Sequence, residues 1–167
     1  CGGSARAVIA GLNVIGVSEI NIIGRNSESL CNFIKDLKKL YPNQCSSLKG
    51  ILVDDIQVID FIKKANIIIN TTPVGMQSKE RNNRKYSEIP LGEKIWDKLH
   101  SSTTLYDLIY TPRPTPWLKR GAHKGCSVIN GLEMLIYQGA ASLRIWSGYE
   151  DVPIDTMRKA AELHLNS

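Results

Sequence analysis

The sequence predicts an α/β fold with a doubly wound, mostly parallel sheet and helices on both faces of that sheet. Short β-branched runs alternate along the chain with segments whose apolar residues recur at helical spacing. The run at residues 65–70 is continuously apolar in its centre, as strands buried on both faces of a parallel sheet are. A glycine-rich turn at residues 1–3 leads directly into the first helical segment, which is how a strand and a helix are joined in such folds.

The first part of the chain alternates regularly between the two patterns. Its predicted elements are a helix at 3–16, a strand at 20–24, a helix at 27–41, a strand at 51–53, a helix at 56–64 and a strand at 65–70. Ser27 is a suitable N-cap for the second helix, and Pro42 ends it. This order of elements is typical of a sheet whose helices form the crossover connections.

The second part is less regular but continues the alternation. Its predicted elements are a polar connection at 77–92, a helix at 95–99, a strand at 103–110, a helix at 116–120, a strand at 127–130, a long helix from 132 to about 147 and a terminal helix from near Pro153. Pro116 suits the first turn of its helix, where the missing N–H is not needed. Nothing marks a second domain, so residues 1–167 are predicted to form one domain.

Composition excludes several classes of protein. With 43% hydrophobic and 22% charged residues, the 167-residue chain is ordinary globular material with enough length for one core. It contains no apolar run long enough to cross a membrane and no secretory leader at its start, so a cytoplasmic protein without a membrane partner is expected. The four cysteines are scattered, which argues against a metal site or a disulfide framework.

The net charge of +5 does not point to nucleic acid, because the basic residues do not gather on one periodic face. The densest cluster, at residues 79–85, is polar throughout and fits a solvated loop better than a binding patch. No nucleic-acid partner is therefore expected. A mildly basic surface would still attract an anionic cofactor or a carboxylate substrate.

The turn at the start of the chain favours phosphate binding. Gly2 and Gly3 place no Cβ between the backbone amides and a pyrophosphate, and the helix that follows presents its positive end to the same point. Ser4 would either donate its hydroxyl to the phosphate or cap the helix. A plain helix cap or a flexible segment shows the same residues, so the turn alone leaves both interpretations open.

The end of the predicted strand at 20–24 bears on the choice of cofactor. In this architecture the residue after that strand faces the adenine ribose, where an acidic side chain selects the free 2′-hydroxyl. Here the position holds Arg25, whose planar guanidinium pairs with a phosphate, so the sequence favours NADP over NAD. The alternative is that Arg25 is simply a surface residue at a strand end.

Four motifs, at residues 2–7, 69–76, 106–115 and 130–140, occur in order along the chain. Together they closely resemble the C-terminal, NADP-binding, Rossmann-like domain of shikimate dehydrogenase, and the resemblance covers nearly the whole chain. It implies that the first strand of the sheet and an N-terminal substrate domain lie outside this sequence. Without them, the chain is expected to be inactive alone.

The resemblance also implies a reaction, which is reversible hydride transfer between NADPH and 3-dehydroshikimate to give shikimate, in the chorismate pathway of aromatic amino acid biosynthesis. The Lys and Asp that manage the proton in this family lie in the substrate domain, so no catalytic residue and no metal ligand is assigned here. The resemblance implies that the partner is a small-molecule substrate. The intact protein is expected to be a monomer or a homodimer.

The family motifs place a set of site residues on this chain. Those that the resemblance assigns to the cofactor are Cys1, Gly2, Gly3, Ser4, Ala5, Arg25, Asn26, Ser27, Asn70, Thr71, Thr72, Pro73, Met76, Leu108, Gly131 and Met134. Tyr110 and Gln138 match the positions that reach the substrate. From pattern alone, Tyr110 would be an ordinary strand aromatic and Gln138 a polar interruption of a buried helix.

Some positions depart from the family pattern. Gly24, Asn26 and Ser29 stand where the family often has other residues, and at position 29 that residue is commonly a second basic side chain for the 2′-phosphate. Glu133 replaces a frequent glycine. Two other functions therefore stay open: a quinate/shikimate dehydrogenase that uses NAD, and a nucleotide-binding module without catalysis.

Overall fold

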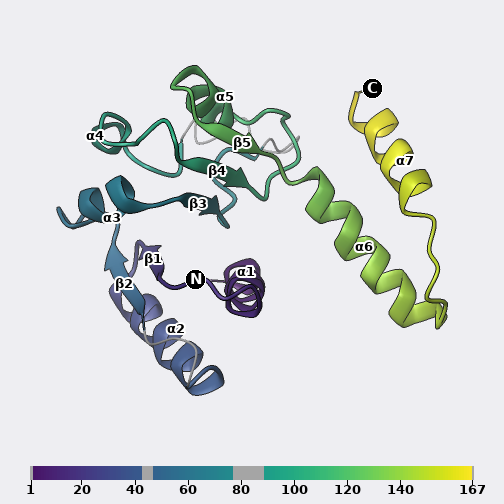
Figure 1. The fold of residues 1–167 in the computed structure, drawn as a ribbon, viewed down its shortest axis with the longest axis horizontal. Helices are drawn as coiled ribbons and strands as arrows, with labels where there is room; N and C mark the ends of the chain where they lie inside the picture. The colour runs from purple at the N-terminus through teal and green to yellow at the C-terminus, as the bar shows by residue number, and fades with distance from the viewer. Residues whose placement is uncertain (1, 43–46, 77–88, 167) are drawn as a thin grey trace. The chain divides into compact units, whose positions relative to one another are not determined.

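The computed structural model describes residues 2–42, 47–76 and 89–166 (Figure 1). These residues form two compact units. The N-terminal unit comprises the described residues of Cys1–Ala65 together with Leu91–His100, and the C-terminal unit those of Asn66–Pro90 together with Ser101–Ser167. The single domain expected over residues 1–167 stays a prediction.

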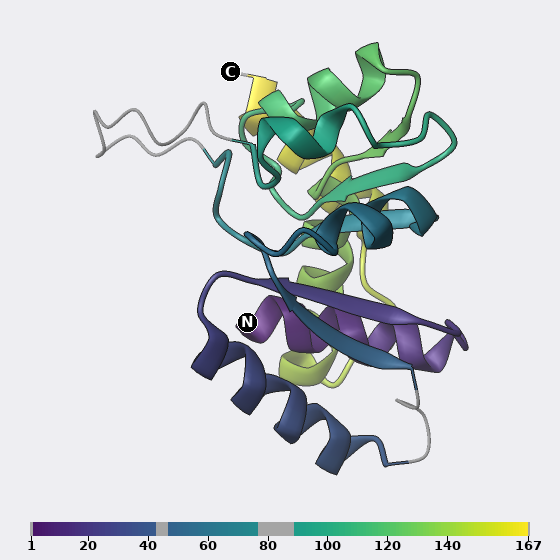
Figure 2. The ribbon, with the colours of Figure 1, turned by 90° about the vertical axis from the view of Figure 1, so that its left-hand side faces the viewer.

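The N-terminal unit is built around two parallel strands. Its elements are α1 (Gly3–Val14), β1 (Ile20–Gly24), α2 (Ser27–Leu40), β2 (Leu48–Leu52), α3 (Val58–Lys64) and α4 (Glu93–Trp96). The pairing of β1 with β2 runs from Ile20 opposite Leu48 to Gly24 opposite Leu52. Figure 2 shows these two strands side by side, with α2 packed along them.

The core of this unit forms where α1 and α2 meet the strands. Phe33 and Leu37 lie one turn apart on α2 and are 3% and 0% exposed, because their spacing keeps both on the face turned toward β1 and β2. They pack with Ile9 of α1 and with Ile20 and Leu48, which begin the two strands. The buried side of α1 is thereby fixed, and its N-terminal end stays exposed.

The C-terminal unit contains a sheet of three parallel strands in the order β3, β4, β5. Its elements are β3 (Ile67–Asn70), β4 (Thr104–Asp107), α5 (Pro116–His123), β5 (Ser127–Ile129), α6 (Leu132–Ser147) and α7 (Ile154–Asn166). The register places Asn70, the last residue of β3, opposite Asp107, the last residue of β4. Helix α5 packs on β4 and β5 and buries Trp117 and Leu118 almost completely.

The predicted α/β class and the parallel strand pairing are confirmed. The prediction that the apolar run at 65–70 is buried on both faces is wrong, since Ile67 is 39% exposed. The physical reason is that β3 is an edge strand of its sheet and pairs only with β4 among the described residues. Exposure of Val128 and Ile129 on β5, the other edge, has the same origin.

Several element boundaries also differ from the prediction. The N-cap of α2 is Asn26 and not Ser27, because Asn26 has extended backbone angles and its Oδ1 accepts the Ser29 N–H at 2.8 Å. Strand β2 begins three residues earlier than predicted, at Leu48, since pairing with β1 starts there. Most of the predicted polar connection at 77–92 lies outside the described residues. Across the described parts of the chain, no helix is long and apolar enough to cross a membrane.

Candidate functional site

The N-terminus of α1 is open. Gly2 is the N-cap, with no side chain to satisfy the first-turn amides, and the first intrahelical bond runs from the Arg6 N–H to the Gly2 carbonyl at 3.1 Å. A Cβ placed on Gly2 or Gly3 would meet no atom within 4 Å, and both glycines are exposed. Ser4 lies within the first helical turn and is exposed, so it does not cap the helix. Such an end suits an anion.

Of the predicted site residues on either side of Gly2–Ser4, the structure describes Ala5 but not Cys1. Ala5 is half-buried on α1 and packs against the core of the N-terminal unit. Cys1, which the resemblance places in the same turn, lies outside the described residues. The described part of the turn therefore consists of two glycines and the first residues of α1.

A second helix N-terminus lies where β1 passes into α2. Arg25 is exposed at the bend between them and forms no ion pair within the described parts of the chain. Asn26 caps α2 through its side chain, and Ser27 is the first residue of the helix and exposed. The Arg25 guanidinium is thus available to an anionic group, whereas the Ser29 amide already bonds Asn26 and the Glu28 carboxylate in the same turn repels an anion.

The two helices that carry these ends are tied together through Arg6. Its guanidinium bonds Asp36 Oδ2 at 2.7 Å and lies 4.9 Å from the centroid of the buried Phe33 ring. A cation over an aromatic face is attractive, and the carboxylate holds that cation in place. The contact fixes the first turn of α1 to the middle of α2.

In the C-terminal unit, the segment after β3 forms a turn held by its own side chains. Asn70 Oδ1 accepts the Thr72 N–H at 3.0 Å and the Thr72 hydroxyl at 2.7 Å, and the Val74 N–H donates to Thr72 Oγ1 at 3.2 Å. Gly75 has φ of 97°, which a side chain would disfavour. The predicted site residues here differ in exposure: Asn70 is buried, Thr71 is half-buried, and Thr72, Pro73 and Met76 are exposed.

Asp107, at the end of β4, is fully buried and lies beside that turn. Its Oδ1 accepts the Asn70 Nδ2–H at 3.0 Å and the Ile109 N–H at 3.1 Å, and its Oδ2 accepts the Thr115 hydroxyl at 2.8 Å. Burial raises the pKa of this carboxyl above its ordinary value, and the hydrogen bonds from Thr115, Ile109 and Asn70 oppose the rise. Thr115 in turn caps α5 by accepting the Leu118 N–H.

The start of α6 lies against the backbone that follows β4. A Cβ on Gly131 would stand 2.0 Å from the Leu108 carbonyl oxygen, so only glycine fits at this distance. The Gly131 N–H donates to the Ile109 carbonyl at 3.1 Å, and Asn130 Oδ1 accepts the Leu132 N–H at 3.0 Å. The structure thereby brings together Leu108 and Gly131, two of the residues predicted to hold the cofactor.

Helix α6 carries the remaining predicted residues. Met134 and Gln138 lie four residues apart on it, so they share a face, with Met134 half-buried and Gln138 exposed. Tyr110 lies beyond the end of β4 and is 38% exposed. The sequence prediction of a strand through residue 110 is therefore wrong, because Asp107 takes up the Ile109 amide that would continue the ladder.

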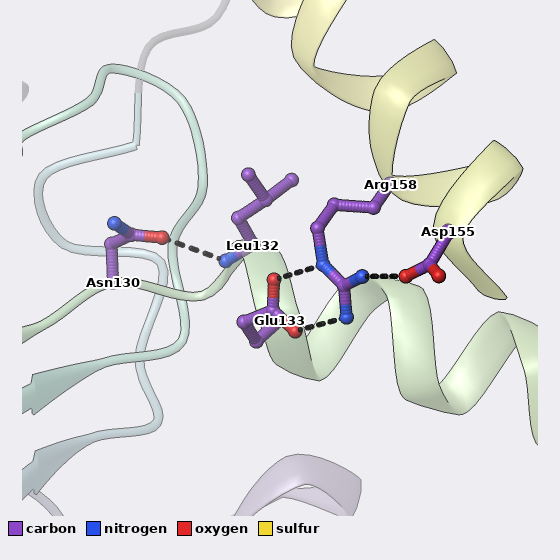
Figure 3. Close-up of polar contacts among 5 residues, drawn as sticks. All are labelled: Asn130, Leu132, Glu133, Asp155 and Arg158. Atoms are coloured by element: carbon purple, nitrogen blue, oxygen red, sulfur yellow. Dashed lines mark hydrogen bonds and ion pairs between the residues drawn. The ribbon is translucent and has the colours of Figure 1, made fainter.

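The first turn of α6 is also fastened to α7. Figure 3 shows Arg158 of α7 between two carboxylates: its guanidinium bonds both oxygens of Glu133, at 2.8 and 3.0 Å, and Asp155 Oδ1 at 2.6 Å. The Arg158 hydrogen bond lowers the pKa of the Glu133 carboxyl. The departure at position 133 thus has a structural role, since a glycine there would lack this bidentate contact.

Comparison with known proteins identifies the family of the chain. A family model described as the Shikimate 5′-dehydrogenase C-terminal domain matches residues 131–162. The shikimate dehydrogenase (NADP(+)) of Prochlorococcus marinus strain MIT 9215 is 43% identical over 98% of this chain, which spans 54% of that relative. The chain is a C-terminal domain of the shikimate dehydrogenase family. It spans about half the length of the curated relatives it matches, 54% in this case.

Solved structures of this family have the same fold. Shikimate 5-dehydrogenase from Listeria monocytogenes, in complex with shikimate and NAD, has a TM-score of 0.80 at 28% identity and covers 95% of this chain and 52% of its own. A shikimate dehydrogenase in complex with NADP+ has a TM-score of 0.74 at 30% identity, over 98% of this chain and 52% of that one. The Rossmann-like fold predicted for the chain is therefore confirmed.

The matched C-terminal region of the shikimate dehydrogenase family begins at Gly131 and takes in α6 and most of α7. It includes the glycine that approaches Leu108 as well as Met134, Gln138 and the Arg158 clamp. Within each unit, most of the predicted site residues lie near the ends of strands or the starts of helices, and Gln138 lies further along α6. The described residues contain no group of His, Cys, Asp and Glu side chains able to hold a metal ion.

Sequence reasoning did not assign Asp107 and Thr115 to the site of this shikimate dehydrogenase domain. Both stand in a motif that was recognised, but their bonding partners lie at other sequence positions. An acidic residue at the end of an otherwise apolar strand was the available signal. Its partner, Asn70, becomes evident only from the strand register.

Asp107 also leads to a prediction about pH. Its pKa is raised in the folded protein, so its contribution to stability is fully present below the unfolded pKa, near 3.8, and is lost as pH rises through the folded pKa. Asparagine does not titrate, so Asp107→Asn does not undergo this pH-dependent loss of stability. The melting temperature of Asp107→Asn relative to the natural protein should therefore rise between pH 3.5 and pH 7, measured by circular dichroism in about half-unit steps. A difference that falls over this range would contradict the assigned direction.

Proposed function

We propose that the protein is an NADP-dependent shikimate dehydrogenase and that residues 1–167 form its cofactor-binding domain. The reaction is reversible hydride transfer between NADPH and 3-dehydroshikimate. The observation that carries the proposal is the open N-terminus of α1, where exposed glycines leave first-turn amides free of any side-chain cap. Names of the curated relatives, NADP(+) shikimate dehydrogenases, support the cofactor and the substrate.

The adenosine half of the cofactor belongs to the N-terminal unit in this proposal. Gly2, Gly3 and Ser4 receive the pyrophosphate with their backbone amides, and the resemblance adds Cys1 and Ala5 to this turn. Arg25 pairs with the 2′-phosphate, which Asn26, the N-cap of α2, and Ser27, its first residue, also face. Support comes from the exposure of Arg25 and from its lack of an ion-pair partner among the described residues.

The nicotinamide half belongs to the C-terminal unit. When bound, the nicotinamide supplies the hydride-transfer chemistry, and the residues proposed to hold that half are Asn70, Thr71, Thr72, Pro73, Met76, Leu108, Gly131 and Met134. The close approach of Gly131 to Leu108 supports a flat surface for the ring, because Gly131 itself has no side chain. Tyr110 and Gln138, both exposed, would bond the hydroxyl or carboxylate oxygens of the substrate.

No residue of this chain is proposed as the catalytic acid or base, because the family pattern places the Lys and Asp of proton transfer in a substrate domain that these residues do not include. The chain alone is expected to bind cofactor without turnover. A cytoplasmic protein that acts as a monomer or a homodimer completes the proposal, without a nucleic-acid or membrane partner.

Arg25→Ala tests the cofactor assignment. Loss of the guanidinium should weaken binding of 2′,5′-ADP by about 1–3 kcal/mol, the value of a charge-assisted hydrogen bond, and leave binding of 5′-AMP unchanged. Isothermal titration measures both. Lys38→Ala is the matched control, since Lys38 is an exposed cation in the last turn of α2, the helix that Arg25 precedes. Equal affinity of the natural protein and Arg25→Ala for 2′,5′-ADP would remove Arg25 from the site.

A quinate/shikimate dehydrogenase that uses NAD is the second candidate. One observation favours it: Arg25 is the only basic residue at 25–29, and Glu28 lies in the first turn of α2 beside it. Steady-state rates with shikimate and with quinate, each with NADP and with NAD, discriminate between the two enzymes. Cofactor binding with no turnover of either substrate in the full-length protein would instead indicate a nucleotide-binding module.

A further inference from the structure

The buried carboxylate of Asp107 joins three segments of the C-terminal unit. Its first oxygen accepts from Asn70 of β3 at 3.0 Å and from the Ile109 amide at 3.1 Å, and its second oxygen accepts from Thr115 at 2.8 Å. All of these donors are neutral, and Asp107 and Thr115 are both 0% exposed. A buried carboxylate that accepts several well-placed hydrogen bonds acts as a rigid junction.

Asn70 extends this junction to the turn that follows β3. Its side-chain N–H groups donate to Asp107 and, at 3.2 Å, to the Val74 carbonyl, while its Oδ1 accepts both the amide and the hydroxyl of Thr72. The amide of an asparagine side chain can be turned in either of two ways. Here Asp107 Oδ1 and the Val74 carbonyl both accept from Asn70 Nδ2, so together they fix which way the Asn70 amide points and thereby which groups of Thr72 are held.

We infer that Asp107 is a positioning residue, which holds the turn at 71–76 and the segment Leu108–Tyr110 in the arrangement that receives the nicotinamide half of the cofactor. This inference rests on the proposed function. Asp107 does not touch the cofactor in this scheme. It acts through Asn70 on one side and through the Ile109 backbone on the other, and Thr115 fixes the second oxygen.

A carboxylate suits this junction and an amide does not. An asparagine at position 107 has one acceptor oxygen and one donor nitrogen. If the nitrogen faced Asn70 and Ile109, donors would oppose donors. If it faced Thr115 instead, the hydroxyl of that residue would have to accept from position 107 as well as from the Leu118 N–H, and it would lose its own acceptor. Either arrangement loosens the junction and leaves the side-chain volume unchanged.

The experiment compares two ligands on the full-length protein. Asp107→Asn and Thr115→Val should each raise the dissociation constant for NADP+ about tenfold, as expected when one hydrogen bond to a charged group is lost, and leave that for 2′,5′-ADP unchanged. Thr115→Ser retains the hydroxyl and should restore NADP+ affinity to within about twofold of the natural protein. Thr103→Val is the control for stability alone, since Thr103 is equally buried just before the opposite end of β4.

The outcomes separate the inference from the proposed function. If the natural protein binds neither ligand, the proposed function fails. Suppose instead that it binds both ligands and that Asp107→Asn and Thr115→Val fold. The inference is then overturned if these variants bind NADP+ with the natural affinity. It is also overturned if their affinity for 2′,5′-ADP falls as much as their affinity for NADP+. The inference is likewise overturned if Thr103→Val weakens NADP+ binding as much as Asp107→Asn and Thr115→Val do. Should Asp107→Asn fail to fold, the Thr115→Val and Thr115→Ser pair decides alone.

Discussion

Gly131→Ala is expected to destabilise the protein by about 3 kcal/mol, the upper end of the range for overpacked sites. The added Cβ would stand 2.0 Å from the Leu108 carbonyl oxygen and 2.4 Å from its carbon, and both are backbone atoms that cannot rotate away. Gly131 has φ of −78°, which any residue adopts, so the whole effect comes from lack of space. To relieve it, the start of α6 must move away from the end of β4.

Urea denaturation followed by circular dichroism measures this loss. Gly11→Ala is the matched control, because a Cβ there meets no atom within 4 Å and Gly11 lies inside α1. That change should stabilise the protein by about 0.5–1 kcal/mol through helix propensity. A Gly131→Ala protein as stable as the natural one would show that the helix start is not held against Leu108. In the proposed site, the same displacement would also weaken NADP+ binding.

Phe33→Ala is expected to destabilise the protein by about 3–5 kcal/mol, as truncation of a buried aromatic ring does. The side chain is 3% exposed at the centre of the N-terminal core and supports the Arg6 guanidinium 4.9 Å from its ring centroid. Its loss leaves a cavity between α2 and the strands and frees the first turn of α1. Binding of 2′,5′-ADP should therefore fall together with stability.

Leu40→Ala is the control for the Phe33 variant, since Leu40 ends the same helix and is 63% exposed. Its effect should stay within about 0.5 kcal/mol, as for other surface substitutions. Thermal melts and urea titrations of both variants test the contrast. Similar losses for the two variants, or a loss below about 1 kcal/mol for Phe33→Ala, would contradict the assignment of Phe33 to the core.

Local signals predicted most of the helices well, although the helix predicted at 95–99 lies at Glu93–Trp96. The spacing of apolar residues after Gly131 indicates a long helix, and α6 runs from Leu132 to Ser147. Pro116 occupies the first turn of α5, where its missing amide is not needed. These features depend on residues within a few positions of one another, so one sequence contains what is required to recognise them.

The strand ends were predicted less well. The run at 103–110 is uniformly suited to a strand, yet β4 ends at Asp107 because that side chain bonds the Ile109 amide. The run at 65–70 is apolar, yet Ile67 is exposed at a sheet edge. In both places the outcome depends on partners distant in sequence, which a pattern of neighbouring residues does not reveal.

The candidate site shows the same division. The sequence by itself determined the glycine turn, Arg25 after the strand at 20–24 and the family to which the chain belongs, because each rests on residue types in a short motif. Only the tertiary structure decided that Gly131 has room for no side chain and that Asp107 joins Asn70, Ile109 and Thr115. The reason is physical: steric exclusion and buried hydrogen bonding act over a few ångströms, and chain folding decides which distant residues come that close.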